Sequence, residues 1–456
     1  MLDPALAPSP TDDAIPIHLV RAAGLESLEL PAAARAFAAA TGFDPKAGKL
    51  LVCPDGEGRM ACVLLGLGPD ADPFAAGRLA TELPAGTYRF AAPPDDPALA
   101  TLAFLLGRYR FTRYRDRPAP AIRLVPPDGA DPAEATRIAG AVAMGRDLVN
   151  MPANELGPDG IEEAARRLAE RHGAAISAIV GDDLLDADLP MIHAVGRASD
   201  RAPRLIDLSW GEPDAPRVTI VGKGVAFDTG GLDIKPSAGM LLMKKDMGGA
   251  AAALALFDMV IGARLPVRLR VLIPAVENAI SGNAFRPGDV LRSRAGLSVE
   301  IGNTDAEGRL ILADALTLAD EEEPELLVDF ATLTGAARVA LGPDLPPLYT
   351  ADEALAADLL RLGAAVNDPV WRMPLWAPYR RMLDSKVADT NNVSSGGFAG
   401  SVTAALFLAR FVKAARSYAH LDIYAWTPSA RPGRPEGGEV QGARLLYAYL
   451  RERFGR

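Results

Sequence analysis

The octapeptide NTDAEGRL, Asn303 to Leu310, places two acidic residues two positions apart and follows them with a glycine and an arginine. The mostly small and apolar run that comes next, up to Ala319, has the composition of a buried helix. Carboxylates against such a core are costly unless something pairs with them, and a divalent cation can do so. Alternatively, Asp305 and Glu307 simply sit at the positive end of the helix. The octapeptide alone leaves both interpretations open.

Chain length and charge narrow the class of protein. With 456 residues, the chain is too long for one ordinary core, so we expect two domains. Apolar residues make up 49% and charged residues 23%, which is a normal balance for a globular protein. The net charge of -10 and the lack of a long basic run argue against nucleic acid and against an anionic membrane surface as partners.

The two cysteines and the N-terminus predict a cytoplasmic protein. Cys53 and Cys62 fit neither a disulfide scaffold nor a zinc pattern, so we expect small apolar strand residues in a reducing compartment. Residues 1–16 contain acidic residues and no apolar core of a signal peptide. No uninterrupted apolar run reaches the length of a membrane span.

Alternating strand and helix patterns predict an α/β protein in two parts. Residues 1–125 form a small N-terminal α/β domain, 126–132 (PPDGADP) a linker, and 133–456 a larger three-layer α/β/α domain with a mixed, largely parallel sheet. Asp131 is expected to cap a helix that begins at Pro132. Buried strands are predicted at 217–221, 267–273 and 326–330, and helices at 161–172 and 249–262.

A glycine-rich loop follows the strand at 217–221, where the carboxyl ends of strands form sites in open α/β sheets. It carries Lys223, Asp228 and Lys235, and Asp246 follows shortly after. One alternative is phosphate binding, but GxxxxGK[ST] is absent; the other is a surface turn, which does not explain so many charges among glycines. The four histidines form no HExxH or HxH pattern and are expected to be structural, so a metal would rest on oxygen ligands and lysine.

Three stretches together resemble the leucyl aminopeptidase family of two-metal peptidases. They are VGKGVAFDTGGLDIKPSAGMLLMKKDMGGAA, NTDAEGRLILADAL and ATLTGA, with further support at 371–376, 388–392 and 419–423. The resemblance covers most of residues 140–450, whereas the N-terminal domain matches only in size and α/β character. It implies a metal-dependent aminopeptidase that releases the N-terminal residue of a peptide by attack of a water activated by two ions.

The resemblance also implies the metal ligands. Asp228 and Glu307 would bridge two divalent ions, Asp305 would complete one shell, and Lys223 and Asp246 the other. A lysine can be a ligand only as the free amine, and burial and adjacent cations both lower a lysine pKa. Such sites accept zinc or manganese, and also magnesium or cobalt.

Lys235 would stabilise the oxyanion of the tetrahedral intermediate, and Arg309 would hold a bicarbonate ion that acts as general base. The alternative for Arg309 is a salt bridge to Asp305 or Glu307. Met243, Thr332 and Gly335 would line the pocket for the N-terminal side chain, although Met243 could equally be plain core. The family further implies a homohexamer acting on peptides with a free N-terminus, and leaves the N-terminal domain an oligomerisation or regulatory role.

Two departures from the family pattern bear on specificity. Asp233 adds a carboxylate where a smaller polar residue is common, and the segment 424–438 is longer and bulkier than the family's small-residue loop at the expected pocket rim. Two other functions remain: a phosphate-binding transferase, and a non-enzymatic, metal-stabilised hexameric scaffold or DNA-binding protein.

Overall fold

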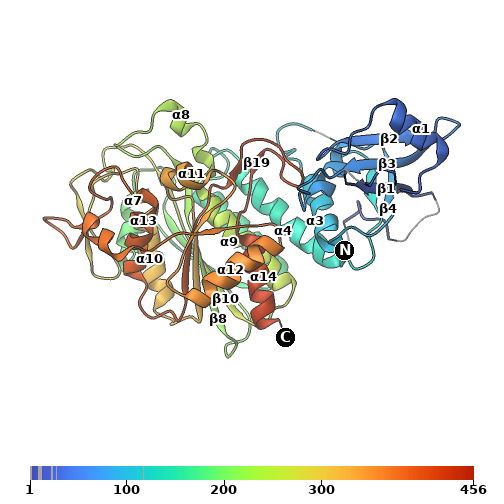
Figure 1. The fold of residues 1–456 in the computed structure, drawn as a ribbon. Coiled ribbons are helices and arrows are strands. Elements are labelled where there is room, and N and C mark those ends of the chain that lie inside the picture. The colour runs from blue at the N-terminus through green and yellow to red at the C-terminus, as the bar shows by residue number, and fades with distance from the viewer. Residues whose placement is uncertain (1–2, 9–12, 22–23, 27, 117, 456) are drawn as a thin grey trace. The chain divides into compact units, whose positions relative to one another are not determined.

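The computed structural model describes residues 3–8, 13–21, 24–26, 28–116 and 118–455. The chain forms two compact units, one of Met1–Ala143 with Ser429–Glu436 and the other of Met144–Pro428 with Gly437–Arg456 (Figure 1). The division between them lies inside helix α4 (Pro132–Asn150), C-terminal to the expected linker at 126–132. The Asp131 carboxylate accepts hydrogen bonds from the amides of Ala133 and Glu134, so the predicted cap is confirmed.

The small unit is built on a five-stranded sheet of order β2-β3-β1-β4-β5. Its strands are β1 (Ile15–Val20), β2 (Leu50–Pro54), β3 (Met60–Gly66), β4 (Gly86–Phe90) and β5 (Ile122–Leu124). Only β2 runs antiparallel to its neighbour among these strands. The helices are α1 (Ala32–Ala40), α2 (Leu79–Glu82) and α3 (Pro97–Gly107). Cys53 and Cys62 lie opposite each other on β2 and β3, buried and free, which confirms their prediction as apolar strand residues.

The segment Ser429–Glu436 belongs to this small unit, although it comes late in the sequence. Within the unit, the Arg434 guanidinium lies over the Phe74 ring at 4.8 Å. The expectation that the segment 424–438 lies at the pocket rim therefore stays a prediction for Ser429–Glu436, which is grouped with the small unit. Tyr424, at the start of the segment, does line the cavity described below.

The large unit contains a nine-stranded sheet of order β15-β14-β17-β13-β8-β10-β7-β6, with β9 paired to β10. Its strands are β6 (Ala175–Val180), β7 (Arg204–Trp210), β8 (Arg217–Gly222), β9 (Gly224–Asp228), β10 (Arg268–Asn278), β13 (Leu326–Ala331), β14 (Pro347–Tyr349), β15 (Trp371–Arg372) and β17 (Tyr418–Asp422). The central strands β17, β13, β8 and β10 are mutually parallel, whereas β6, β7 and β14 pair antiparallel with their inner neighbours. The sheet is thus mixed and largely parallel at its centre, as predicted.

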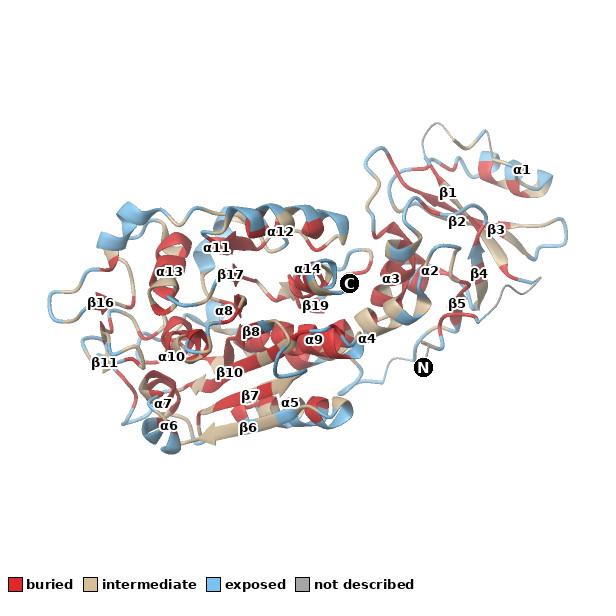
Figure 2. Cartoon of the chain, turned by 90° about the horizontal axis from the view of Figure 1, so that it is seen from below, coloured by how far each residue is buried: buried red, intermediate tan, exposed pale blue. Residues whose placement is uncertain are grey.

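Helices cover both faces of this sheet. One face carries α7 (Pro190–Gly196), α10 (Gly308–Asp320) and α13 (Gly400–Leu408), and the other α5 (Pro158–His172), α9 (Gly248–Gly262) and α14 (Ala443–Phe454) (Figure 2). Every residue of α9 but its last is buried, which its continuous apolar sequence requires. Smaller elements are α6 (Asp183–Asp186), α8 (Ser237–Met240), α11 (Gly335–Leu341), α12 (Glu353–Ala365), β11 (Val290–Arg292), β12 (Ser298–Glu300), β16 (Thr390–Asn391), β18 (Trp426–Thr427) and β19 (Gly437–Gly438).

Among the described residues, no helix combines the length and the apolar character needed to cross a bilayer.

Candidate active site

One cavity of about 480 Å³ brings together every residue that the sequence singled out for a site. These residues are Lys223, Asp228, Lys235, Met243, Asp246, Asp305, Glu307, Arg309, Thr332 and Gly335. The cavity lies at the carboxyl ends of β8, β9 and β13, because Lys223 directly follows β8, Asp228 ends β9 and Thr332 follows β13. A parallel sheet collects the ends of its strands at one edge, so these distant stretches meet there.

Lys223 lies at the bottom of the cavity, with only 2% of its surface exposed. Its Nζ is 2.8 Å from Asp246 Oδ2 and 3.0 Å from Glu307 Oε1, and it donates to the carbonyl of Thr332 at 2.9 Å. A Cβ on Gly308 would lie 2.4 Å from the Lys223 Cε, so any other residue after Glu307 would displace the end of the Lys223 side chain. The glycine of NTDAEGRL thus makes room for the lysine of a separate motif.

Lys235 pairs with the two remaining carboxylates of the cluster. Its Nζ is 2.8 Å from Asp228 Oδ2 and also contacts Asp305 Oδ1. Its side chain is 15% exposed, compared with 3% for that of Lys223. Lys235 is therefore a cation at the cavity surface, whereas Lys223 is enclosed.

The interpretation of Asp305 and Glu307 as helix-capping acids is wrong. Glu307 occupies the N-cap position of α10, but its side chain forms no capping hydrogen bond. It points instead into the carboxylate cluster, where it meets Lys223. Asp305 pairs with Lys235.

The carboxylate cluster fits divalent cations. Oxygens of Asp228, Asp305 and Glu307 all lie within 4.8 Å of one another, and Glu307 Oε2 is buried without a hydrogen-bond partner in the described chain. Burial and the charge of Asp246 raise the pKa of Asp228 to about 6, and burial and the charge of Asp228 raise that of Glu307 to about 8. Bound cations would relieve this repulsion, and oxygen donors suit hard or borderline ions.

Lys223 differs from the expectation in one respect. Burial does lower its pKa, but the charges of Asp246, Glu307 and Asp228 outweigh burial and hold the pKa above its ordinary value. Without cations, Lys223 is a charged ammonium that neutralises carboxylates. A cation that takes up its nitrogen as a ligand must therefore displace a proton.

Arg309 does not form the alternative salt bridge to Asp305 or Glu307. Its Nη1 donates to the carbonyl of Asn392 at 2.7 Å, and its Nε is buried without a hydrogen-bond partner among the described residues. Burial lowers its pKa to about 10. Arg309 is thus a buried cation beside the cavity with an uncommitted donor, as an anion site requires.

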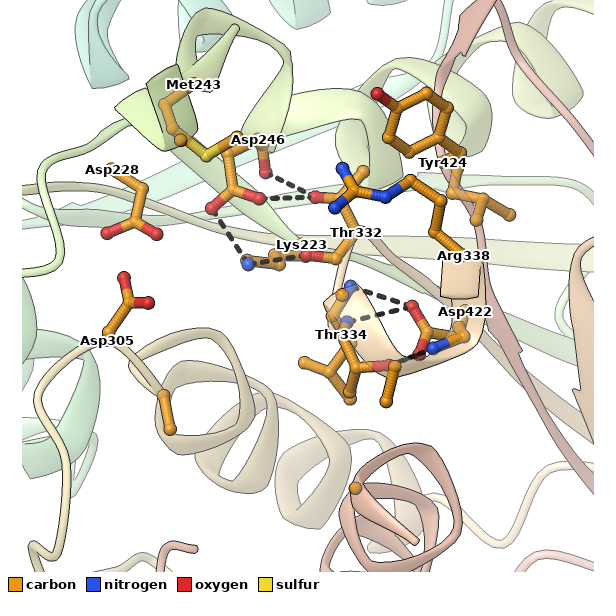
Figure 3. A pocket seen from close by; sticks show the side chains of 18 of the residues that line it. Lys223, Asp228, Met243, Asp246, Asp305, Thr332, Thr334, Arg338, Asp422 and Tyr424 are labelled. Atoms are coloured by element: carbon orange, nitrogen blue, oxygen red, sulfur yellow. Dashed lines mark hydrogen bonds and ion pairs between the residues drawn. The ribbon is translucent and has the colours of Figure 1, made fainter. Parts of the chain in front are cut away.

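The loop after β13 joins the carboxylates to the rest of the cavity (Figure 3). The Thr332 hydroxyl donates to Asp246 Oδ1 at 2.7 Å. Asp422, which ends β17, accepts hydrogen bonds from the amides of Leu333 and Thr334 at 2.9 and 3.1 Å and from the Thr334 hydroxyl at 2.6 Å. Asp422 therefore fixes the loop that positions Asp246.

A second side of the cavity contains cations that sequence analysis missed. Lys245 is 6% exposed, and its Nζ lies 4.4 Å from the centre of the Tyr424 ring. The Arg338 guanidinium lies over the same ring at 5.4 Å. Burial lowers the pKa of Lys245 to about 8, although the charge of Asp246 acts in the opposite direction. In the sequence, only the position of Lys245 next to Asp246 indicates that it lies in the cavity. Nothing in the sequence indicates this for Arg338, because only the fold brings it to the cavity.

Asp233 and the histidines lie outside the cluster. The Asp233 carboxylate accepts from the amide of Thr304 at 2.8 Å and so braces the loop before Asp305. His420 pairs with Asp329 at 2.7 Å and His172 with Asp258 at 2.6 Å. Of the residues that the structure describes, no histidine joins the group that could hold a metal.

Comparisons with known proteins agree with this geometry. Residues 143–447 match the model of the cytosol aminopeptidase family, catalytic domain, and residues 15–127 match that of the M17 aminopeptidase N-terminal domain. The chain belongs to the cytosol aminopeptidase family. It is therefore a peptidase, and the leucyl aminopeptidase resemblance is confirmed.

Individual members of the cytosol aminopeptidase family resemble the chain over nearly its whole length. A probable cytosol aminopeptidase of Roseiflexus castenholzii is 42% identical over 439 residues, which are 88% of this chain and 89% of that protein. The crystal structure of the cytosol aminopeptidase from Coxiella burnetii is 44% identical, with a TM-score of 0.93 and 98% of each chain covered. The bottromycin maturation enzyme BotP in complex with Mn is 34% identical, with a TM-score of 0.87, covering 97% of this chain and 99% of that chain.

Proposed function

We propose that this protein is a metal-dependent aminopeptidase that removes the N-terminal residue from peptides with a free amino group, using two divalent ions. The observation that carries the proposal is the cluster of Asp228, Asp305 and Glu307, whose oxygens lie within 4.8 Å of one another beside Lys223 and Lys235. Family membership supports the reaction, and the geometry supports the ions.

Five residues would hold the two ions. We assign Asp228 and Glu307 to both ions, Asp305 to one, and Lys223 and Asp246 to the other. Zinc or manganese are the expected ions, and magnesium or cobalt would also suit these ligands. The BotP structure was solved with Mn, which supports manganese. When bound, such ions supply a Lewis acid for the peptide carbonyl and lower the pKa of a water molecule.

The remaining residues act on the peptide and on protons. Lys235 reaches the cavity surface as a cation, so it can donate to the oxyanion that develops on the scissile carbonyl. Arg309 has an uncommitted buried Nε, which suits an anion such as bicarbonate that takes a proton from water. Met243, Thr332 and Gly335 line the same cavity and would receive the N-terminal side chain.

We further propose a cytoplasmic homohexamer in which the small unit serves assembly or regulation. The names of the relatives, cytosol aminopeptidases, support the location. For the hexamer, the support is the family resemblance.

The test is hydrolysis of aminoacyl amides by metal-stripped protein with Zn²⁺ or Mn²⁺ added back, each substrate with a free and with an acetylated N-terminus. The proposal predicts cleavage that requires metal and a free amino group. Cleavage of acetylated substrates, or none despite two bound ions, would contradict it; the second result would favour a metal-stabilised scaffold.

A further inference from the structure

The cavity has two cations, Lys245 and Arg338, on the side away from Asp228 and Asp305 (Figure 3). There Lys245 and Arg338 flank Tyr424, at 4.4 and 5.4 Å from the ring centre. All three residues line the cavity. In Figure 3, Arg338 and Tyr424 lie together, separated from Asp228 and Asp305. We call Lys245, Arg338 and Tyr424 the cationic wall.

Lys245 is more than nine-tenths buried as a residue, yet its ammonium forms no hydrogen bond or ion pair with any described residue. Such an uncompensated buried cation is costly, and the face of one aromatic ring offsets only part of that cost. The nearby acids are already engaged: Asp246 by Lys223 and Thr332, and Asp422 by Leu333 and Thr334. The Lys245 ammonium is therefore available to an anionic group that enters the cavity.

The neighbouring Lys244 differs from Lys245 in its surroundings. Lys244 lies on the same short helical turn, Met243–Met247, but its Nζ donates to the carbonyl of Asn150 at 2.7 Å. It does not line the cavity, whereas Met243, Lys245 and Asp246 do. The Lys244 ammonium thus has a hydrogen-bond acceptor within the protein, whereas the Lys245 ammonium is free to bind a ligand.

The position of Lys245 indicates which part of a substrate it would meet. Lys245 directly precedes Asp246, one of the assigned metal ligands, and Thr332, which donates to that carboxylate, lines the same cavity as the cationic wall. A peptide whose amino end and first carbonyl lie at the carboxylates would place its first side chain against Thr332 and the cationic wall. A carboxylate on that side chain would reach an ammonium and, near the mouth, a guanidinium.

We propose that Lys245, supported by Arg338, is a specificity-determining residue that selects peptides with an acidic N-terminal residue, glutamate or aspartate. This inference rests on the proposed function as an aminopeptidase. Tyr424 would fill the part of the pocket that a large apolar side chain needs. The segment 424–438 therefore acts on specificity through its first residue.

The test compares kcat/KM for Glu, Gln, Asp, Asn and Leu amides of one leaving group, at one neutral pH and with saturating Mn²⁺. Glu should exceed Gln, and Asp should exceed Asn, by about 10- to 100-fold, which is the size of a hydrogen bond to a charged group. In Lys245→Met this ratio should collapse toward one while Leu cleavage persists. Lys244→Met, the matched control, should keep the ratio.

Dipeptides locate the contact. Glu-Ala should be preferred over Ala-Glu by the wild-type protein, and Arg338→Met should reduce the preference less than Lys245→Met does. Equal rates for Glu and Gln substrates, an unchanged ratio in Lys245→Met, or a preference only for an acid at the second position would overturn the inference. Each of these results requires cleavage of some substrate, so they differ from failure of the proposed function, in which no substrate is cleaved.

Discussion

The two sides of the cavity differ in how their charges are balanced. On one side, which we call the carboxylate wall, Asp228, Asp246, Asp305 and Glu307 surround Lys223 and Lys235, and both lysines contact acids at 3.0 Å or less. On the cationic wall, the Lys245 ammonium lies over the Tyr424 ring and forms no ion pair with any described residue, although the charge of Asp246 acts on it. The acids of the carboxylate wall are thus neutralised in part by the protein's own lysines, in the place where metal ions would bind. The cationic wall has no such internal partner, so we expect a substrate to supply the negative charge.

Among substitutions in the carboxylate wall, we expect the largest effect from a change at Glu307. Glu307→Gln keeps the shape but removes a charge that is 1% exposed and assigned to both ions. We expect loss of both ions and turnover at background, because Glu307 belongs to the carboxylate group with Asp228 and also contacts Lys223. Metal content by mass spectrometry and initial rates measure this.

Glu321→Gln is the control, because Glu321 pairs with Arg294 at the surface and its side chain is 48% exposed. It should keep both ions and its activity. Two ions per chain in Glu307→Gln would show that the carboxylate wall is not the metal site.

The lysines of the carboxylate wall can be separated by their roles. Lys235→Met should leave the ions bound and reduce kcat by about 10²- to 10³-fold, as loss of one oxyanion donor does. Lys386→Met, at an exposed site outside the cavity, should behave as wild type. Wild-type turnover in Lys235→Met at full metal occupancy would refute the oxyanion role.

Thr332 bonds to the carboxylate wall and lines the same cavity as the cationic wall, so it tests whether the two walls act independently. Thr332→Val keeps the shape and removes the hydrogen bond to Asp246 Oδ1. Metal affinity should fall by about 10- to 100-fold, which is typical of lost support for a ligand, while the Glu-to-Gln substrate ratio stays constant. Metal titrations and kcat/KM ratios measure these two effects.

Thr403→Val is the matched control, since Thr403 is buried in α13 and bonds only to its own helix. It should change neither quantity. A changed substrate ratio in Thr332→Val would mean that the two walls are coupled.

The last expected effect is on stability without metal. Burial raises the pKa of Glu307 from 4.5 to about 8 and that of Asp228 from 3.8 to about 6, so the folded protein binds more protons than the unfolded chain across this range. Its free energy of unfolding should therefore fall as pH rises, by up to about 1.4 kcal/mol per pH unit, between about 3.8 and 6 through Asp228 and between about 4.5 and 8 through Glu307.

In metal-loaded protein, Glu307 and Asp228 should no longer make the free energy of unfolding depend on pH in this range, because the ions hold both groups ionised. Asp314, whose pKa burial raises to about 7, lies outside the cavity and should contribute equally with and without metal. Thermal melts across this pH range check the difference. Identical slopes with and without metal would contradict the assignment of Glu307 and Asp228 as ligands.

The sequence predicted the carboxylate wall better than the cationic wall for a physical reason. Acids such as Asp305 and Glu307 beside an apolar helix need compensation, so their chemistry is visible locally. The pattern of Lys245 and Tyr424 is indistinguishable from an ordinary surface or core pattern until the fold brings Arg338 beside them. The parallel centre of the sheet was likewise visible in buried apolar strands, whereas the antiparallel pairing of β6 and β7 was not, because half-buried edge strands such as Ala175–Val180 give weak patterns.

The most direct test of the central claim, that the carboxylate wall holds two ions, is anomalous diffraction from crystals of the protein grown with Mn²⁺. We expect two anomalous peaks, both contacted by Asp228 and Glu307, with the Lys223 nitrogen changed from an ion-pair partner to a ligand. No peak among these residues, with Lys223 still paired to Asp246 and Glu307, would contradict it.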